Sequence, residues 1–384
     1  MSRDDFELPQ SGFTFWNVGT GDSTVVSIDD EHVVLVDIRH LELAEDDDDP
    51  RIPIIDYLVE NLPRRDGEPY LATFVLTHPD QDHCQGFAEL IEKVHVGELW
   101  FAPRVLQEYD EDLCDDAQTF VDEVDRRLGA IAAEGVKSGN RLRVIGYADV
   151  LDEPPYDKIP DVLVTVPGST VSLVDGDDVS GSFEAFIHAP FKEDAEAERN
   201  ETSVGMRVSL YSGSDRLQAL LLGDLSNPTL NRIFDVSEPD STSWDVLLAP
   251  HHCSKSTMYY QDGDNEVLDK ALMERLEESG SACRYVVSSS DPIPSENKPG
   301  DNPPHAKAKS QYEQIVDLGH FLCTGEHGSE DELTPVSFAV GEVDCGYTGG
   351  SDDSESSSSA RDAVDRARGD DSPPRQSTRF GQWR

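Results

Sequence analysis

Residues 76 to 87 read LTHPDQDHCQGF, which places two histidines and two aspartates within six positions. His78, Asp80, Asp82 and His83 form the pattern H-x-D-x-D-H, between an apolar run and a helix that we expect to open near Gly86. Crowded carboxylates and imidazoles are tolerated in a protein interior when a cation or hydrogen-bond donors satisfy them. Alternate residues of an extended segment project to one side, so this segment can hold one cation or two. The alternative is an ordinary Asp-rich turn with structural histidines.

Other polar residues stand at the ends of apolar runs far away in the chain. Asp224 ends LQALLLGD, His251 and His252 follow DVLLAP, and Asp37 ends HVVLVD. A carboxylate at the end of a buried strand is costly without a partner. Because sites are often built from loops on a rigid scaffold, we expect these residues to meet the H-x-D-x-D-H segment in one metal site.

The elements that must position these residues alternate between strands and helices. Residues 13–18, 23–28 and 32–38 read as three short strands separated by turns, which predicts a meander. Residues 52–62 carry apolar side chains at helical spacing, and 73–78 read as a buried strand that ends on His78. Clusters of strands with helices between them continue to about residue 340. The pattern predicts an α/β fold of two mixed sheets face to face with helices outside.

The overall charge is strongly negative. The chain of 384 residues has 78 acidic and 31 basic residues, a formal net charge of -47 and a pI near 4.3. Acidic residues spread along the whole chain are typical of a halophilic protein, because molar salt shortens the Debye length to about 3 Å and screens self-repulsion. Repulsion of nucleic acid or recruitment of a basic partner is the alternative. No apolar stretch approaches the roughly 18 residues of a membrane span, and no secretion signal is visible, so we expect a cytoplasmic protein without membrane contact.

Composition also divides the chain. We expect one large domain over residues 1–347, with an acidic helical insertion near 104–140. Residues 348–384 are rich in Ser, Asp and Arg and poor in apolar residues, which predicts a disordered tail. Its last residues, RFGQWR, are either an unstructured end or a docking segment for a protein partner.

Five stretches in order resemble the metallo-β-lactamase fold, and within it the soluble nuclease-like domain of the competence protein ComEC. They are NVGTGDST, VVLVDI, THPDQDHCQG, LLLGDL and DVLLAPHHCSKS, with a weaker match at FIHAPF. The resemblance implies a four-layer αββα sandwich and two divalent metal ions, zinc or manganese, with magnesium possible. Asp80 stands where many relatives have a second histidine, and this harder ligand favours manganese or magnesium.

The resemblance also implies the metal ligands. His78 and Asp80 would hold the first ion, and Asp82 and His83 the second. Asp224 would bridge both ions, and His251 is preferred over His252 as a ligand of the second ion, with His252 close to the site. Asp37 would orient a metal-binding histidine without binding metal itself. His188 is either a ligand or a strand residue.

The function implied is hydrolysis of a phosphodiester by a hydroxide that two metals activate. The catalytic residues would be Asp82, Lys255 and His305. Lys255 would steady a phosphate oxygen, and His305 would protonate the leaving oxygen. The alternative is that Lys255 is an exposed lysine and His305 a histidine at a helix N-terminus, both without a catalytic role. The substrate would be nucleic acid or a nucleotide. Two alternatives are a metallo-hydrolase of small esters, thioesters or lactones, and a regulatory binding module with a vestigial site.

Overall fold

The computed structural model describes residues 6–46, 48–102, 113–146, 160, 163–191, 199–329 and 331–341. All of these residues lie in one compact unit, Met1–Gly349. The tail expected at 348–384, and residues 104–112 of the expected insertion, lie outside the described residues.

The first sheet has nine strands and comes mostly from the first half of the chain. Its first three strands form the predicted antiparallel meander, and the third pairs in parallel with the buried strand before the H-x-D-x-D-H segment. The strand order is β20 (Val336–Ala339), β1 (Gly12–Phe15), β2 (Thr24–Ser27), β3 (Val33–Val36), β5 (Glu68–Leu76), β6 (His95–Phe101), β7 (Arg141–Ile145) and β8 (Val164–Thr165), with β4 (Arg64–Arg65) paired to β5.

The second sheet has seven strands and comes mostly from the second half of the chain. Its strand order is β19 (Phe321–Cys323), β18 (Gly280–Ser288), β15 (Trp244–Leu248), β14 (Asp215–Leu221), β13 (Gly205–Ser212), β12 (Phe183–Ala189) and β9 (Thr170–Val171). Two small hairpins stand apart from both sheets: β10 (Leu173–Val174) with β11 (Asp177–Asp178), and β16 (Tyr259–Asp262) with β17 (Asn265–Leu268).

Helices cover the outer face of each sheet. Those over the first sheet are α1 (Ile54–Asn61), α3 (Phe87–Lys93) and α5 (Asp115–Glu134), and those over the second are α7 (Asn227–Val236), α9 (Lys270–Ser279) and α10 (Ala306–Ile315). Apolar side chains at helical spacing, such as Ile54, Ile55 and Leu58, face the sheet. A third apolar cluster fills the space between the sheets.

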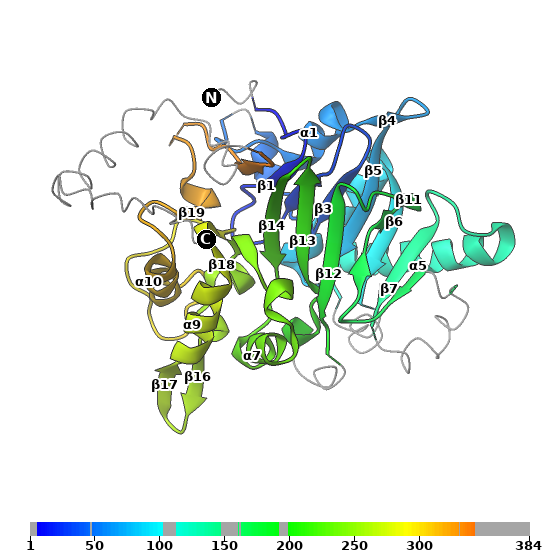
Figure 1. Ribbon diagram of the computed structural model, residues 1–384. Coiled ribbons are helices and arrows are strands. Elements are labelled where there is room, and N and C mark those ends of the chain that lie inside the picture. Colours follow the sequence, from blue (N-terminus) through cyan, green and yellow to red (C-terminus); the bar gives the residue numbers. More distant parts are fainter. Residues whose placement is uncertain are drawn as a thin grey trace, which may run out of the picture. The chain divides into compact units, whose positions relative to one another are not determined.

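The layers therefore run helix, sheet, sheet, helix, and the predicted four-layer sandwich is confirmed. Figure 1 shows β12, β13 and β14 of the second sheet in front of β3 and β5 of the first. Among the described residues, no helix is both long and apolar enough to cross a membrane.

Candidate metal centre

Four strand ends bring the polar residues together. Asp37 follows β3 and His78 follows β5, which are parallel neighbours in the first sheet. Asp224 follows β14 and the pair His251 and His252 follows β15, which are parallel neighbours in the second sheet. Because parallel neighbours end at the same edge, each sheet presents its polar residues at one edge, as α/β folds do at ligand sites.

The two carboxylate oxygens of Asp224 face two different sets of imidazoles. Oδ1 lies 3.2 Å from Nε2 of His83 and 3.7 Å from Nε2 of His252. Oδ2 lies 3.8 Å from Nε2 of His78 and 3.5 Å from Nε2 of His251. One carboxylate can thus serve two neighbouring cation positions at once.

Three further aspartates complete the two sets. Asp80 Oδ2 lies 3.6 Å from Nε2 of His78, on the Oδ2 side of Asp224. Asp82 Oδ2 lies 3.2 Å from Nε2 of His252, and Asp22 Oδ1 lies 3.3 Å from Nδ1 of the same ring. One buried group has ligand atoms that all lie within 4.8 Å of one another: Asp22, His83, Asp224 and His252.

The donor set fits metal ions because its inward atoms have no other partner. Among the described residues, the buried atoms that lack a hydrogen bond include Nε2 of His78, Nε2 of His83, Oδ1 of Asp22, Oδ1 of Asp224 and both ring nitrogens of His252. Buried polar atoms are rarely left without partners. Nitrogen and carboxylate donors that converge in this way match the ligands of zinc and manganese.

The electrostatics of the site point the same way. Burial opposes the charged form of His252, but the negative charges of Asp224 and Asp22 raise its pKa to about 10. Burial also opposes ionisation of Asp224, yet the positive charges of His83 and His252 hold its pKa well below the ordinary value. The carboxylates thus attract positive charge strongly, and bound divalent cations would replace the imidazole protons.

Neighbouring side chains orient the imidazoles. Oδ2 of Asp37 accepts hydrogen bonds from Nδ1 of His83 at 2.8 Å and from the Thr77 hydroxyl at 2.7 Å. Nδ1 of His78 lies 3.1 Å from the Thr77 hydroxyl oxygen and 3.2 Å from that of Ser203. The Asp37 carboxylate places a proton on Nδ1 of His83, and the Thr77 and Ser203 hydroxyls, which donate to Asp37 and to the Asn200 carbonyl oxygen, accept from Nδ1 of His78. Each Nε2 therefore faces Asp224 and would be the nitrogen that binds a cation.

Strained backbone aims the late histidines. The segment α8 (Pro250–Cys253) has left-handed conformations at His251, His252 and Cys253, with φ of 53°, 51° and 64°. Asp37 also has a positive φ, of 57°. Such conformations cost of order 1–3 kcal/mol each and cluster at functional sites. Here the left-handed turn lets two consecutive rings reach the two oxygens of one carboxylate.

The structure differs from the sequence-based ligand set at the two late histidines. It places His252 in the buried group around Oδ1 of Asp224, where His251 was preferred. His251 instead lies nearer Oδ2, on the side of His78 and Asp80. The left-handed turn is the reason, because it sends the two rings in different directions.

His188 lies in β12 and has its own partners, so we leave it out of the ligand set. Its Nδ1 lies 3.1 Å from the Ser237 hydroxyl oxygen, and its Nε2 lies 3.0 Å from the Ser241 carbonyl oxygen. Both ring nitrogens are therefore used in fastening β12 to the end of α7 and the following turn.

A pH dependence of stability follows from this placement. Burial lowers the pKa of His188 to about 4, below the 6.5 of an exposed histidine. Between these values the unfolded chain gains a proton that the folded chain does not, so stability falls as pH drops from 6.5 to 4. We expect the advantage of wild type over His188→Gln in free energy of unfolding to shrink by about 3 kcal/mol from pH 7 to pH 4. Urea unfolding at several pH values measures it, and a constant difference contradicts the assignment.

Lys255 and His305 lie beside the centre, outside the cavity over it. That cavity has a volume of about 510 Å³, and its lining residues are Thr20, Arg39, Gln81, Asp82, Gln85, His251, His252, Asn302 and Pro303. Nζ of Lys255 pairs with Glu266 at 2.7 Å. Nδ1 of His305 accepts a hydrogen bond from the Lys255 backbone, and its Nε2 lies 3.2 Å from the Asp301 carbonyl oxygen. Neither residue is among those that line the cavity containing Asp82, and both side chains have other partners, so we do not carry their expected catalytic roles into the proposed function.

Asp22 and Arg39 are the site residues that sequence reasoning missed. Asp22 lies in GTGDST, which reads as an ordinary turn. Its position in this Gly-rich stretch, one of the five that resemble the family, could have marked it as a site residue. Arg39 immediately follows the strand-end segment of Asp37 and hydrogen-bonds the Thr20 carbonyl oxygen. A side chain at Gly21 would clash with Arg39 and Asp82, so this close approach requires glycine.

A second group of possible ligands lies at the surface. His40, Glu45 and Glu89 place one ligand atom each within 4.8 Å of the others. Nζ of Lys93 already pairs with Glu89 at 2.6 Å, and Nε2 of His40 lies 2.9 Å from Glu45. Both carboxylates of this group are thus already paired, so we assign it no cation.

Comparisons with known proteins give similarity to solved structures only. A scan against protein-family models finds no match, and neither does a comparison with curated proteins. The solved structures that resemble the chain include a B3 metallo-β-lactamase that has an active-site glutamic acid. The two chains are 14% identical, the alignment covers 71% of this chain and 86% of that chain, and the TM-score is 0.34. Another is an archaeal metallo-β-lactamase superfamily protein from Sulfolobus tokodaii, with 13% identity, 70% and 86% coverage and a TM-score of 0.31. A third is a subclass B3 metallo-β-lactamase of Bradyrhizobium japonicum, with 14% identity, 63% and 75% coverage and a TM-score of 0.32.

Proposed function

We propose that this chain is a metal-dependent hydrolase that cleaves phosphodiesters and holds two divalent cations. The observation that carries the proposal is the carboxylate of Asp224, whose two oxygens face two separate sets of imidazoles. One set would be His78, Asp80 and His251, and the other His83, His252 and Asp82 or Asp22. Bound in this way, divalent cations would supply a water of lowered pKa and would neutralise charge on the attacked group.

A fixed positive charge in the cavity supports an anionic substrate. Arg39 lines the cavity beside Asp82 and His252, and it is the one lysine or arginine among the described lining residues. Its Nε is buried and has no hydrogen-bond partner among the described residues. Arginine donors suit phosphate oxygens. Because the guanidinium of Arg39 carries a permanent positive charge, the cavity favours an anionic phosphodiester over a neutral ester or lactone.

Substitution of Arg39 tests the substrate class. We expect Arg39→Met to lower kcat/KM for bis(p-nitrophenyl) phosphate by about tenfold to a hundredfold, since it removes one charge-assisted contact. Arg39→Lys should restore part of the loss, and hydrolysis of the neutral ester p-nitrophenyl acetate should not change. The control is Arg126→Met, at an exposed arginine paired with Glu123. Equal losses on both substrates would contradict a phosphate-binding role.

The direct test of the function is turnover of purified protein with Mn²⁺, Zn²⁺ or Mg²⁺. The panel contains single-stranded and double-stranded DNA, RNA, cyclic nucleotides and neutral esters, in salt at which circular dichroism shows a folded chain. Cleavage of any phosphodiester, lost on chelation and regained with metal, supports the proposal. Cleavage of esters alone would favour the small-ester hydrolase instead.

Two further proposals concern the setting of this activity. The resemblance of THPDQDHCQG and DVLLAPHHCSKS to the ComEC nuclease-like domain supports nucleic acid as the phosphodiester. The net charge of -47 supports a cytosol of high salt, where long-range repulsion between this protein and a nucleic acid is screened. Contacts at close range would then provide most of the binding.

A further inference from the structure

A second cavity beside the metal centre gathers positive charge. It has a volume of about 400 Å³, and its walls include Lys255, Lys298 and Lys307. The whole chain has only nine lysines against 78 acidic residues, so three lysines around one cavity stand out. Glu296 is the one acidic residue among the described lining residues. In this acidic protein the cavity walls are net positive.

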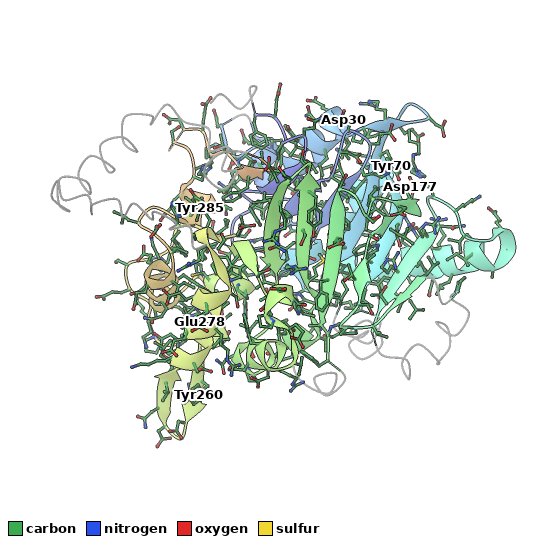
Figure 2. The ribbon with its side chains drawn as sticks, viewed as in Figure 1. Asp30, Tyr70, Asp177, Tyr260, Glu278 and Tyr285 are labelled. Carbon is green, nitrogen blue, oxygen red and sulfur yellow. The ribbon has the colours of Figure 1, made fainter. Side chains whose placement is uncertain are left out.

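Two of the three lysines form an ion pair with a carboxylate and, within the part of the chain that the structure describes, the third does not. Glu266, in the β16–β17 hairpin, holds Nζ of Lys255 and Nζ of Lys307 at 2.7 Å each, so both ammonium groups are fixed at the cavity. Figure 1 shows this hairpin beside α9, and Tyr260 marks it in Figure 2. Lys298 has no carboxylate partner for its ammonium group among the described residues. The cavity therefore has one available cation and two that are held in place.

One loop contributes lining residues to the second cavity and to the cavity over the metal centre. Asn302 and Pro303 line the first cavity, while Lys298 and His305, from the same loop, line the second. The backbone N–H of Lys255 donates to Nδ1 of His305 at 3.3 Å, which ties this loop to the segment just after the metal-site histidines. The start of α10 also lies here, and the N-terminal end of a helix favours negative charge.

We propose that this lysine cavity binds a second phosphate of the substrate, one that is not cleaved. The inference rests on the proposed phosphodiester hydrolysis and extends it to a substrate with at least two phosphates. The lysines do not line the cavity with Asp82 and His252, so we assign them a phosphate other than the reacting one. Because one loop lines both cavities, we expect the lysines to meet a neighbouring group of the same molecule. The second phosphate is either the next one in a polynucleotide or a terminal phosphate of a nucleotide.

The experiment measures binding and turnover separately for Lys298→Ala, Lys307→Ala and the double variant. Three fluorescently labelled ligands are used: a dinucleoside monophosphate, the same molecule with an added 5′-phosphate, and a trinucleoside diphosphate. Binding is followed by fluorescence anisotropy with Ca²⁺, and turnover is followed with Mn²⁺. Lys137→Ala, at an exposed lysine paired with Glu134, is the matched control.

We expect the double variant to bind ligands with two phosphates about tenfold more weakly and to bind the single-phosphate ligand as wild type does. The slope of log affinity against log salt should fall by about one for each lysine removed. A loss confined to the trinucleoside identifies a backbone phosphate, and a loss confined to the 5′-phosphorylated ligand identifies a terminal one.

The two proposals fail in different ways. Unchanged affinity of the double variant for both two-phosphate ligands would overturn the lysine subsite, even if wild type cleaves them. Wild type that binds these ligands more tightly than the variants but cleaves none with any metal would overturn the phosphodiester hydrolase and leave the subsite standing. Wild type that binds none of the ligands would overturn the subsite as well.

Discussion

Asp224→Asn should lose about a thousandfold in kcat/KM and bind at most one of two metal ions. The asparagine side chain has one oxygen, so it can serve His83 and His252 or His78 and His251, but not both pairs. Loss of one buried charged partner costs about 3–5 kcal/mol, and about 4 kcal/mol corresponds to a thousandfold in rate. Metal content after dialysis, measured by mass spectrometry of the elements, follows the ions, and hydrolysis of bis(p-nitrophenyl) phosphate follows the rate.

The control for this variant is Asp235→Asn, at an exposed aspartate of α7 that pairs with Arg275. Circular dichroism should show both variants folded, because Asp224 contributes to the site and not to the apolar cores. Full activity and two bound ions in Asp224→Asn would show that this carboxylate does not bridge.

Asp37→Asn should weaken metal binding by about tenfold to a hundredfold without removing any ligand. Oδ1 of Asp37 accepts the backbone N–H of Thr77 at 2.8 Å, which keeps an oxygen in that place. The side-chain NH₂ group of the asparagine would then face Nδ1 of His83, and Nδ1 would have to accept a hydrogen bond from it. The proton of the ring would move to Nε2, the nitrogen that points toward Asp224. Asparagine also tolerates the positive φ at this position, so the backbone should not change.

Two measurements separate this effect from simple damage to the fold. Competition with a chromophoric chelator gives the metal affinity, and nitrogen NMR of the imidazoles reports which ring nitrogen of His83 carries the proton. A folded Asp37→Asn variant with unchanged tautomer and unchanged affinity would show that Asp37 does not orient His83.

The sequence predicted the scaffold well because its signals are local. Three short β-rich runs gave the meander, and apolar residues at helical spacing gave α1 and α3. Residues at the ends of apolar runs proved to lie together, because strand polarity fixes which edge of a sheet they reach. The expected placement of His78 just after a buried strand is confirmed.

What the sequence did not predict depends on conformation and packing. The separation of His251 from His252 requires a left-handed backbone at three consecutive non-glycine residues, which no residue type there signals. The place of Lys255 depends on its ion pair with Glu266 in the hairpin that follows, which no local pattern signals. His188 ends a strand like the other site residues, but the turn after α7 supplies partners for both of its nitrogens.

The central claim is that two cations lie on either side of one carboxylate. A crystal grown or soaked with Mn²⁺, with anomalous scattering recorded above and below the manganese edge, tests it most directly. We predict two peaks about 3.5–4 Å apart, one toward His78 and His251 and the other toward His83 and His252, with Asp224 between them. A fully soaked crystal with no anomalous peak beside Asp224, or with a single peak on one side, would contradict the account.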